Sequence, residues 1–102
     1  MYSARDERDN AEWLAELETA ADRLGLGTES RSCARDIFLS AVPPQERSKP
    51  AAVAGALYVG TLISGDQRSQ SDVADAVGVS RLAVQKRWKT LLENAGLESP
   101  SW

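Results

Sequence analysis

Apolar residues recur every three or four positions along most of this chain, which is the spacing of α-helices with one buried face. An early stripe predicts a helix over residues 10–24, ended by two glycines, and consists of Trp13, Leu14, Leu17, Ala21 and Leu24. A second helix is predicted over residues 29–41, with Thr28 as its cap and Pro43-Pro44 closing it. Its apolar positions are Cys33, Ile37, Phe38 and Ala41.

A third predicted helix begins near Pro50 and is rich in small residues. Proline suits a first helical turn because the N–H that it lacks would be unpaired there. Alanines and Gly55 lie on every side of this segment, so we expect a central helix that several neighbours cross closely. The residues Ser64-Gly65-Asp66 end it.

The most informative pattern lies in residues 70–88, which read QSDVADAVGVSRLAVQKRW. A short apolar stripe predicts a helix here and consists of Val73, Ala74 and Val77. Ala74 is small enough for another helix to cross closely over it. Gly78 stops the helix, since glycine adopts the left-handed conformation of a tight turn without steric cost. We expect Val79 to anchor this turn in the core.

A further helix is expected from about Arg81, directly after Ser80. Serine is a strong N-cap because its hydroxyl accepts a backbone N–H of the first helical turn. The buried stripe of this helix is predicted to consist of Val84, Trp88 and Leu91, widened by Leu92 and Ala95. The two helices and their turn match a helix-turn-helix, and the alternative is a helical hairpin whose basic face is simply solvated.

The outward face of this last helix carries the candidate DNA-binding residues, which are Arg81, Gln85, Lys86 and Lys89. Arg and Lys suit guanine edges and phosphates, and Gln suits adenine edges, so the face fits the major groove of duplex DNA. We also expect Gln70 and Ser80 near phosphates, because backbone N–H groups at helix N-termini attract anions. Arg87 flanks the buried stripe, and its role stays open between a backbone contact and a brace for the fold.

Four short motifs follow one another in the order and spacing of a known repeat: Ala56-Leu57-Tyr58, Gln70, Gly78-Val79-Ser80 and Arg87-Trp88-Lys89. With the Ala-rich helix, they make residues 34–96 resemble a cyclin-like repeat of transcription factor IIB and its archaeal counterpart, transcription factor B. Upstream the resemblance rests on helix count alone. It implies an all-α, five-helix cyclin-like domain whose last two helices form a helix-turn-helix. We place a flexible N-terminus at 1–9, the helical domain at 10–97 with its helix-turn-helix at about 69–95, and a C-terminal tail at 98–102.

The same resemblance implies a function in transcription. In that family two such repeats follow a zinc ribbon that contacts RNA polymerase, whereas this sequence holds one repeat and no ribbon. We therefore expect a DNA-binding transcription factor or regulator, in which a homodimer would restore two helix-turn-helix units. The alternative is an adaptor that contacts TATA-binding protein, RNA polymerase or another transcription protein without reading bases. The acidic first helix suits such a contact, although an ordinary solvated face is the simpler interpretation.

Charge is distributed unevenly along the chain, whose net charge is −3. Residues 1–30 hold three arginines and eight acids, a charge of −5, and residues 31–102 hold nine basic and seven acidic residues, a charge of +2. Residues 79–92 hold four basic residues and no acid, so the last helix is a positive element on an acidic body. At most four DNA contacts predict a slope of about −4 in log K against log salt, and weak binding by a single copy. Acidic excess with three lysines resembles proteins of halophilic archaea.

The remaining composition argues against several classes of protein. Cys33 is the only cysteine and histidine is absent, so we expect no metal site and no disulfide framework, in a reduced, cytoplasmic setting. Residues 51–63 are too short to span a membrane, which needs roughly 20 apolar residues, and the polar first residues do not form a secretory signal. No carboxylate is paired with a nucleophile and no glycine-rich phosphate loop is present, so we expect neither an enzyme nor a cofactor.

Overall fold

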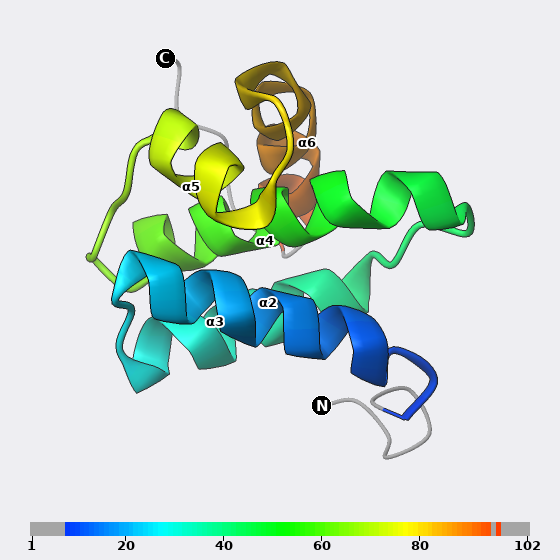
Figure 1. Cartoon of the computed structure of the whole chain (residues 1–102), viewed down its shortest axis with the longest axis horizontal. Coiled ribbons are helices and arrows are strands. Elements are labelled where there is room, and N and C mark those ends of the chain that lie inside the picture. The colour runs from blue at the N-terminus through cyan, green and yellow to red at the C-terminus, as the bar shows by residue number, and fades with distance from the viewer. Residues whose placement is uncertain (1–7, 95, 97–102) are drawn as a thin grey trace.

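The part of the chain that the computed structural model describes, residues 8–94 and 96, is built from helices (Figure 1). Within it, five α-helices and a short 3-10 turn follow one another: α2 (Ala11–Leu24), α3 (Thr28–Ser40), η1 (Glu46–Ser48), α4 (Lys49–Ile63), α5 (Gln70–Val77) and α6 (Arg81–Asn94). In the view of Figure 1, α2 and α3 lie below α4, and α5 and α6 lie above it. The predicted all-α, five-helix cyclin-like architecture is therefore confirmed.

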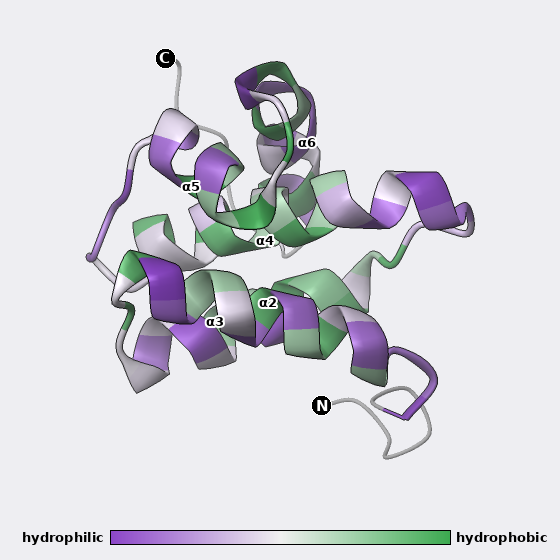
Figure 2. Ribbon diagram, in the orientation of Figure 1, coloured by the Kyte–Doolittle hydropathy of each residue, from purple (hydrophilic) through white to green (hydrophobic). Residues whose placement is uncertain are grey.

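Helix α4 is the centre of the fold. It packs against each of the other four α-helices, and all of its residues from Ala52 to Thr61 are buried. Hydrophobic colour predominates along its middle in Figure 2, whereas hydrophilic positions recur along α2 and α3. A helix that is apolar on all sides has to be enclosed by neighbours, so the sequence-based prediction of a central helix is confirmed.

Glycines let two neighbouring helices approach α4 closely. A Cβ atom built on Gly55 would lie 2.7 Å from Leu91 Cδ1 of α6. A Cβ atom on Gly60 would lie 3.0 Å from the backbone nitrogen of Ala34 and 3.0 Å from the carbonyl oxygen of Ser30, both in α3. Because interiors are close-packed, a methyl group at either position would force its neighbour to shift.

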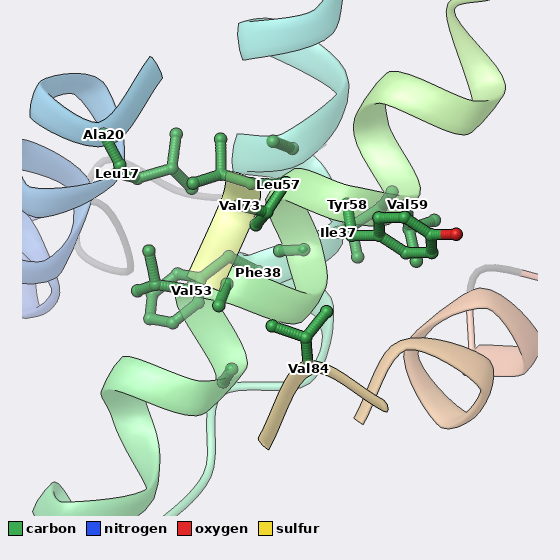
Figure 3. Close-up of a cluster of buried hydrophobic side chains, with 14 of the residues drawn as sticks. Leu17, Ala20, Ile37, Phe38, Val53, Leu57, Tyr58, Val59, Val73 and Val84 are labelled. Carbon is green, nitrogen blue, oxygen red and sulfur yellow. The ribbon is translucent and has the colours of Figure 1, made fainter. Parts of the chain in front are cut away.

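A cluster of buried apolar side chains joins the helices across α4. The members labelled in Figure 3 include Leu17, Phe38, Val53, Leu57, Val73 and Val84, which come from all five helices and are fully buried. Burying an aliphatic or aromatic side chain of this size stabilises the fold by about 1.5–3 kcal/mol. The N-terminal half of α6 is thus tied to the core through Val84, which leaves the opposite face of that helix available.

The predicted α3 helix needs corrections at both ends, and one of its apolar positions is only partly buried. Its N-cap is Gly27, with no side-chain hydrogen bond, and Thr28 is already the first helical residue. The helix ends at Ser40, so Ala41 is its C-cap. Cys33 is only half buried, because the small side chain of Ala34 occupies the position facing α4. The predictions for Ala95, for the first seven residues and for the tail beyond residue 96 lie outside the described residues.

Candidate nucleic-acid interface

The turn that ends α5 is closed by backbone hydrogen bonds around Gly78. This glycine has a φ of 90°, in the left-handed region that an L side chain rarely adopts. Its N–H donates to the carbonyl oxygen of Ala74 at 2.8 Å, and the N–H of Val79 donates to the same oxygen at 3.0 Å. The predicted role of Gly78 is confirmed, and Val79 packs half buried against the core.

Serine caps begin both helices of the motif. The Ser80 hydroxyl oxygen accepts the N–H of Ala83 at 3.1 Å, as predicted for the N-cap of α6. The Ser69 hydroxyl oxygen accepts the N–H of Asp72 at 3.0 Å and caps α5 in the same way. Such caps typically contribute about 1 kcal/mol each, so the start of α6 is specified locally. The two helices and the Gly78–Ser80 turn form the helix-turn-helix.

One face of α6 is held against the core and the other is open. The buried residues are those of the predicted stripe, namely Val84, Trp88, Leu91 and Leu92. The first turns of the helix expose Arg81, Gln85 and Lys86, as the sequence predicted. Arg81, Leu82 and Gln85 line a shallow hollow of about 230 Å³. This hollow lies at the N-terminal end of α6, on the face that we expected to meet DNA.

Leu82 is a candidate binding residue that sequence reasoning missed. It is 59% exposed, between Arg81 and Gln85 on the surface of α6. Its position in the sequence could have revealed this exposure, because Leu82 lies two residues before Val84 and is not part of the buried Val84–Trp88–Leu91 stripe. An exposed leucine among polar side chains adds an apolar contact to the face.

Two of the expected site residues lie differently from the others. The Nζ atom of Lys89 is 5.5 Å from the centroid of the Trp88 ring, and the residue is half buried. Such a cation–π contact holds the ammonium near the protein. Gln70 is also half buried, and its Oε1 atom is buried without a hydrogen-bond partner among the described residues. The side-chain oxygen of Gln70 is therefore turned into the protein.

Arg87 lies at the contact between α6 and α4. Its Cβ atom is 3.1 Å from the position that a Cβ on Gly55 would take, and the residue is half buried. The structure thus places the stem of Arg87 where it braces α6 on α4. That placement favours the second of the two roles that the sequence left open.

A second, larger cleft lies away from this face, between α2 and α5. It has a volume of about 410 Å³ and is lined by Arg23, Leu24, Arg68, Asp72, Asp75 and Ala76. Mixed charge on its walls contrasts with the basic and apolar lining of the hollow on α6. Among residues 8–94 and 96, no three Asp, Glu, Cys or His side chains are grouped so that they could hold a metal ion. No helix in this part of the chain is long and apolar enough to cross a membrane.

Two titratable groups outside the motif are clearly perturbed. The Asp22 carboxylate, 2.6 Å from Nη1 of Arg31, raises the pKa of that guanidinium through a hydrogen bond. Burial raises the pKa of the Cys33 thiol, and the nearby Asp36 and Glu29 carboxylates raise it further. Cys33 is therefore less readily ionised than an ordinary cysteine, which is the opposite of what an activated nucleophile needs.

The arrangement of α4, α5 and α6 defines the class of this protein: an all-α, cyclin-like domain that ends in a helix-turn-helix. The family model for the transcription factor TFIIB repeat matches residues 9–94, and the chain belongs to this family. The match begins at residue 9, so it also covers α2, for which the sequence motifs offered no support beyond helix count.

Archaeal proteins are among the relatives. The chain is 35% identical over 83 residues to a transcription initiation factor IIB of Pyrococcus abyssi, an alignment that covers 78% of this chain and 28% of the relative. It is 35% identical over the same length and coverage to transcription initiation factor IIB 1 of Thermococcus kodakarensis. A transcription initiation factor IIB of Archaeoglobus fulgidus is 33% identical over 78 residues, covering 74% of this chain and 24% of the relative. The chain spans less than a third of the length of these curated relatives.

Proposed function

We propose that this chain acts in transcription as a DNA-binding factor or regulator, with α6 of the helix-turn-helix in the major groove of duplex DNA. The observation that carries the proposal is the division of α6 into two faces. Its apolar side is buried on α4, while Arg81, Gln85 and Lys86 are exposed from its first turns. A recognition helix contacts base edges from its N-terminal residues, so the exposed set lies at the right end.

Each exposed side chain has a DNA group that it fits. The guanidinium of Arg81 suits the O6 and N7 atoms of guanine, and the amide of Gln85 suits adenine. The methyl groups of Leu82 suit the 5-methyl group of thymine. Lys86, one turn further along, suits a phosphate, and the backbone N–H groups after Ser69 and Ser80 add phosphate contacts at the helix N-termini.

Family membership supports a role in transcription, because the relatives bear the name of an initiation factor. We extend the proposal to protein partners of the same process, TATA-binding protein or RNA polymerase. The exposed carboxylates of α2, including Glu12, Glu16 and Asp22, offer a surface that repels DNA and suits a basic protein. If the chain bound its partners only through this surface, it would act as an adaptor that does not read bases.

Fluorescence anisotropy with a random-sequence DNA duplex over a salt series tests the proposal. We expect salt-dependent binding by the wild-type chain and at least about tenfold weaker binding by Lys86→Ala/Lys89→Ala. The matched control is Arg8→Ala/Arg47→Ala, which removes two exposed positive charges outside α6 and should leave affinity within about twofold. Light scattering on the same samples reports whether one or two copies bind.

Either of two outcomes would reject DNA reading by α6. Equal affinity of the double lysine variant and the wild-type chain would show that DNA binds elsewhere. No binding at low salt would favour the adaptor, and a pull-down with TATA-binding protein, comparing wild-type α2 with Glu12→Lys/Glu16→Lys, would then be the deciding measurement.

A further inference from the structure

Two arginines cross between α2 and the helix-turn-helix. Nη1 of Arg23, near the end of α2, donates to the carbonyl oxygen of Ala76 near the end of α5 at 2.8 Å. In the other direction, Nε and Nη2 of Arg68, in the loop before α5, both donate to the carbonyl oxygen of Leu24 at 3.3 Å. Each arginine thus binds the C-terminal end of a helix to which it does not belong.

These two carbonyl groups can accept hydrogen bonds from the arginines because the bonds that cap each helix do not use them. The last carbonyls of any α-helix lack partners within that helix. At the end of α2, the N–H of Gly25 is directed to Ala21 and Asp22, and does not reach Leu24. At the end of α5, the N–H groups of the turn both go to Ala74. A guanidinium is well suited to the remaining carbonyls, since the C-terminal end of a helix carries partial negative charge.

The position of Ala76 connects this contact to the candidate DNA-binding face. Ala76 lies two residues before Gly78, where the turn into α6 begins. Farther along α6, Trp88 and Leu91 are buried on α4 and hold that half of the helix independently. Arg23 therefore holds the end of α5, and the turn that follows this end places Arg81 and its neighbours.

The bond from Arg23 lies at the edge of the apolar contact between α2 and α5. Arg23, Arg68 and Ala76 line the open cleft of about 410 Å³ between α2 and α5. Leu17 of α2 and Val73 of α5 belong to the buried core cluster (Figure 3). Ala76 is itself buried in that cluster, so the bond from Arg23 adds a polar contact at the rim of an apolar one.

We propose that Arg23 and Arg68 are positioning residues that hold the helix-turn-helix in its DNA-reading orientation against α2, and this rests on the DNA binding proposed above. Arg23 is the more direct of the two, because its partner Ala76 belongs to the motif itself. Neither arginine lies in the exposed set on α6, so neither is expected to touch bases.

The test compares Arg23→Met with Arg23→Lys and with Arg47→Met, a control that removes one positive charge from an exposed site in η1. DNA affinity is measured by anisotropy at a temperature at which all variants are folded by circular dichroism. We expect about fivefold weaker binding for Arg23→Met, the order of one hydrogen bond from a charged donor. Arg23→Lys keeps a donor for Ala76 and should bind within about twofold of wild type, as should Arg47→Met.

Hydrogen exchange supplies a readout that a general loss of stability would not move. In Arg23→Met the amides of Gly78 and Val79 should exchange faster by a larger factor than the amide of the buried Val59, which reports global opening. If Arg23→Met proves unfolded, Arg23→Gln takes its place in both measurements.

Equal DNA affinity of Arg23→Met and Arg47→Met would overturn the positioning role, as would uniform acceleration of exchange across the domain. Failure of the wild-type chain to bind any DNA is a different result. It would reject the proposed function and the DNA-reading role of the contact together, while the exchange data alone would still decide whether Arg23 holds the end of α5.

Discussion

The indole ring of Trp88 meets the phenol ring of Tyr58 edge to face, with ring centroids 5.3 Å apart and an interplanar angle of 75°. Trp88 comes from α6 and is fully buried, and Tyr58 comes from the middle of α4. Aromatic pairs of this geometry contribute about 0.5–1.5 kcal/mol beyond the area that they bury. The pair fastens the second half of α6 to the central helix and so determines which side of α6 remains exposed.

Replacing Trp88 should therefore cost more stability than any change on the exposed face. Trp88→Ala leaves a large cavity and should lower the free energy of unfolding by about 3–5 kcal/mol in urea denaturation. Val84→Asp, which buries a charge beneath the same helix, should abolish folding. Lys86→Ala is the control on the exposed side and should change stability by no more than about 0.5 kcal/mol. Equal losses for Trp88→Ala and Lys86→Ala would show that α6 is not held by this contact.

The two glycines of α4 should respond differently to alanine. At Gly60 the added methyl group meets backbone atoms of α3, which cannot move alone, so Gly60→Ala should lose about 1–3 kcal/mol of stability. At Gly55 its nearest neighbour is the end of the Leu91 side chain, which can change rotamer. Both variants gain the same helix propensity, about 1 kcal/mol, so each serves as the other's control. A thermal melt in which Gly55→Ala is the less stable variant contradicts this ranking.

Lys86 and Lys89 should contribute unequally to DNA binding. A lysine that neutralises one phosphate adds about 0.9 to the magnitude of the slope of log K against log salt. Lys86→Ala should remove about that amount, and Lys89→Ala clearly less, because the Lys89 ammonium lies over the Trp88 ring. The whole slope should not exceed about 4 in magnitude. Identical slopes for the two single variants would mean that Lys89 leaves the ring when DNA binds.

The Leu82 side chain should contact the 5-methyl group of a thymine in the major groove. Once a preferred site has been selected from a random duplex library, replacing a contacted thymine by uracil removes only that methyl group. We expect about 1 kcal/mol weaker binding by the wild-type chain and no such penalty for Leu82→Ala. Gln85→Ala should instead relax the preference at one base pair by about 1–3 kcal/mol. A uracil penalty that persists in Leu82→Ala at every thymine of the site assigns the methyl contact to another residue.

Short sequence motifs identified only part of the repeat. Gly78-Val79-Ser80 and Arg87-Trp88-Lys89 identified the second half of the repeat, because a tight turn and a buried aromatic residue are each specified by few residue types. Helix α2 has no comparable motif, since many sequences with apolar residues at helical spacing form such a helix. Its place in the repeat was predicted from helix count alone, and the family match over residues 9–94 shows it.

The sequence by itself determined where α4 begins and ends, where α5 ends, where α6 begins and which face of α6 is buried. Glycine at a left-handed turn, serine at an N-cap and apolar residues at helical spacing act over a few neighbouring residues, so no other part of the chain is needed to recognise them. Only the tertiary structure decided the contacts made between elements. Three such contacts depend on how neighbouring helices are placed and which rotamers they permit. They are the Lys89 ammonium over the Trp88 ring, the inward Oε1 of Gln70 and the hydrogen bond from Arg23 to Ala76. Long side chains reach many partners at similar cost, and local spacing carries no information about which of them the fold brings near.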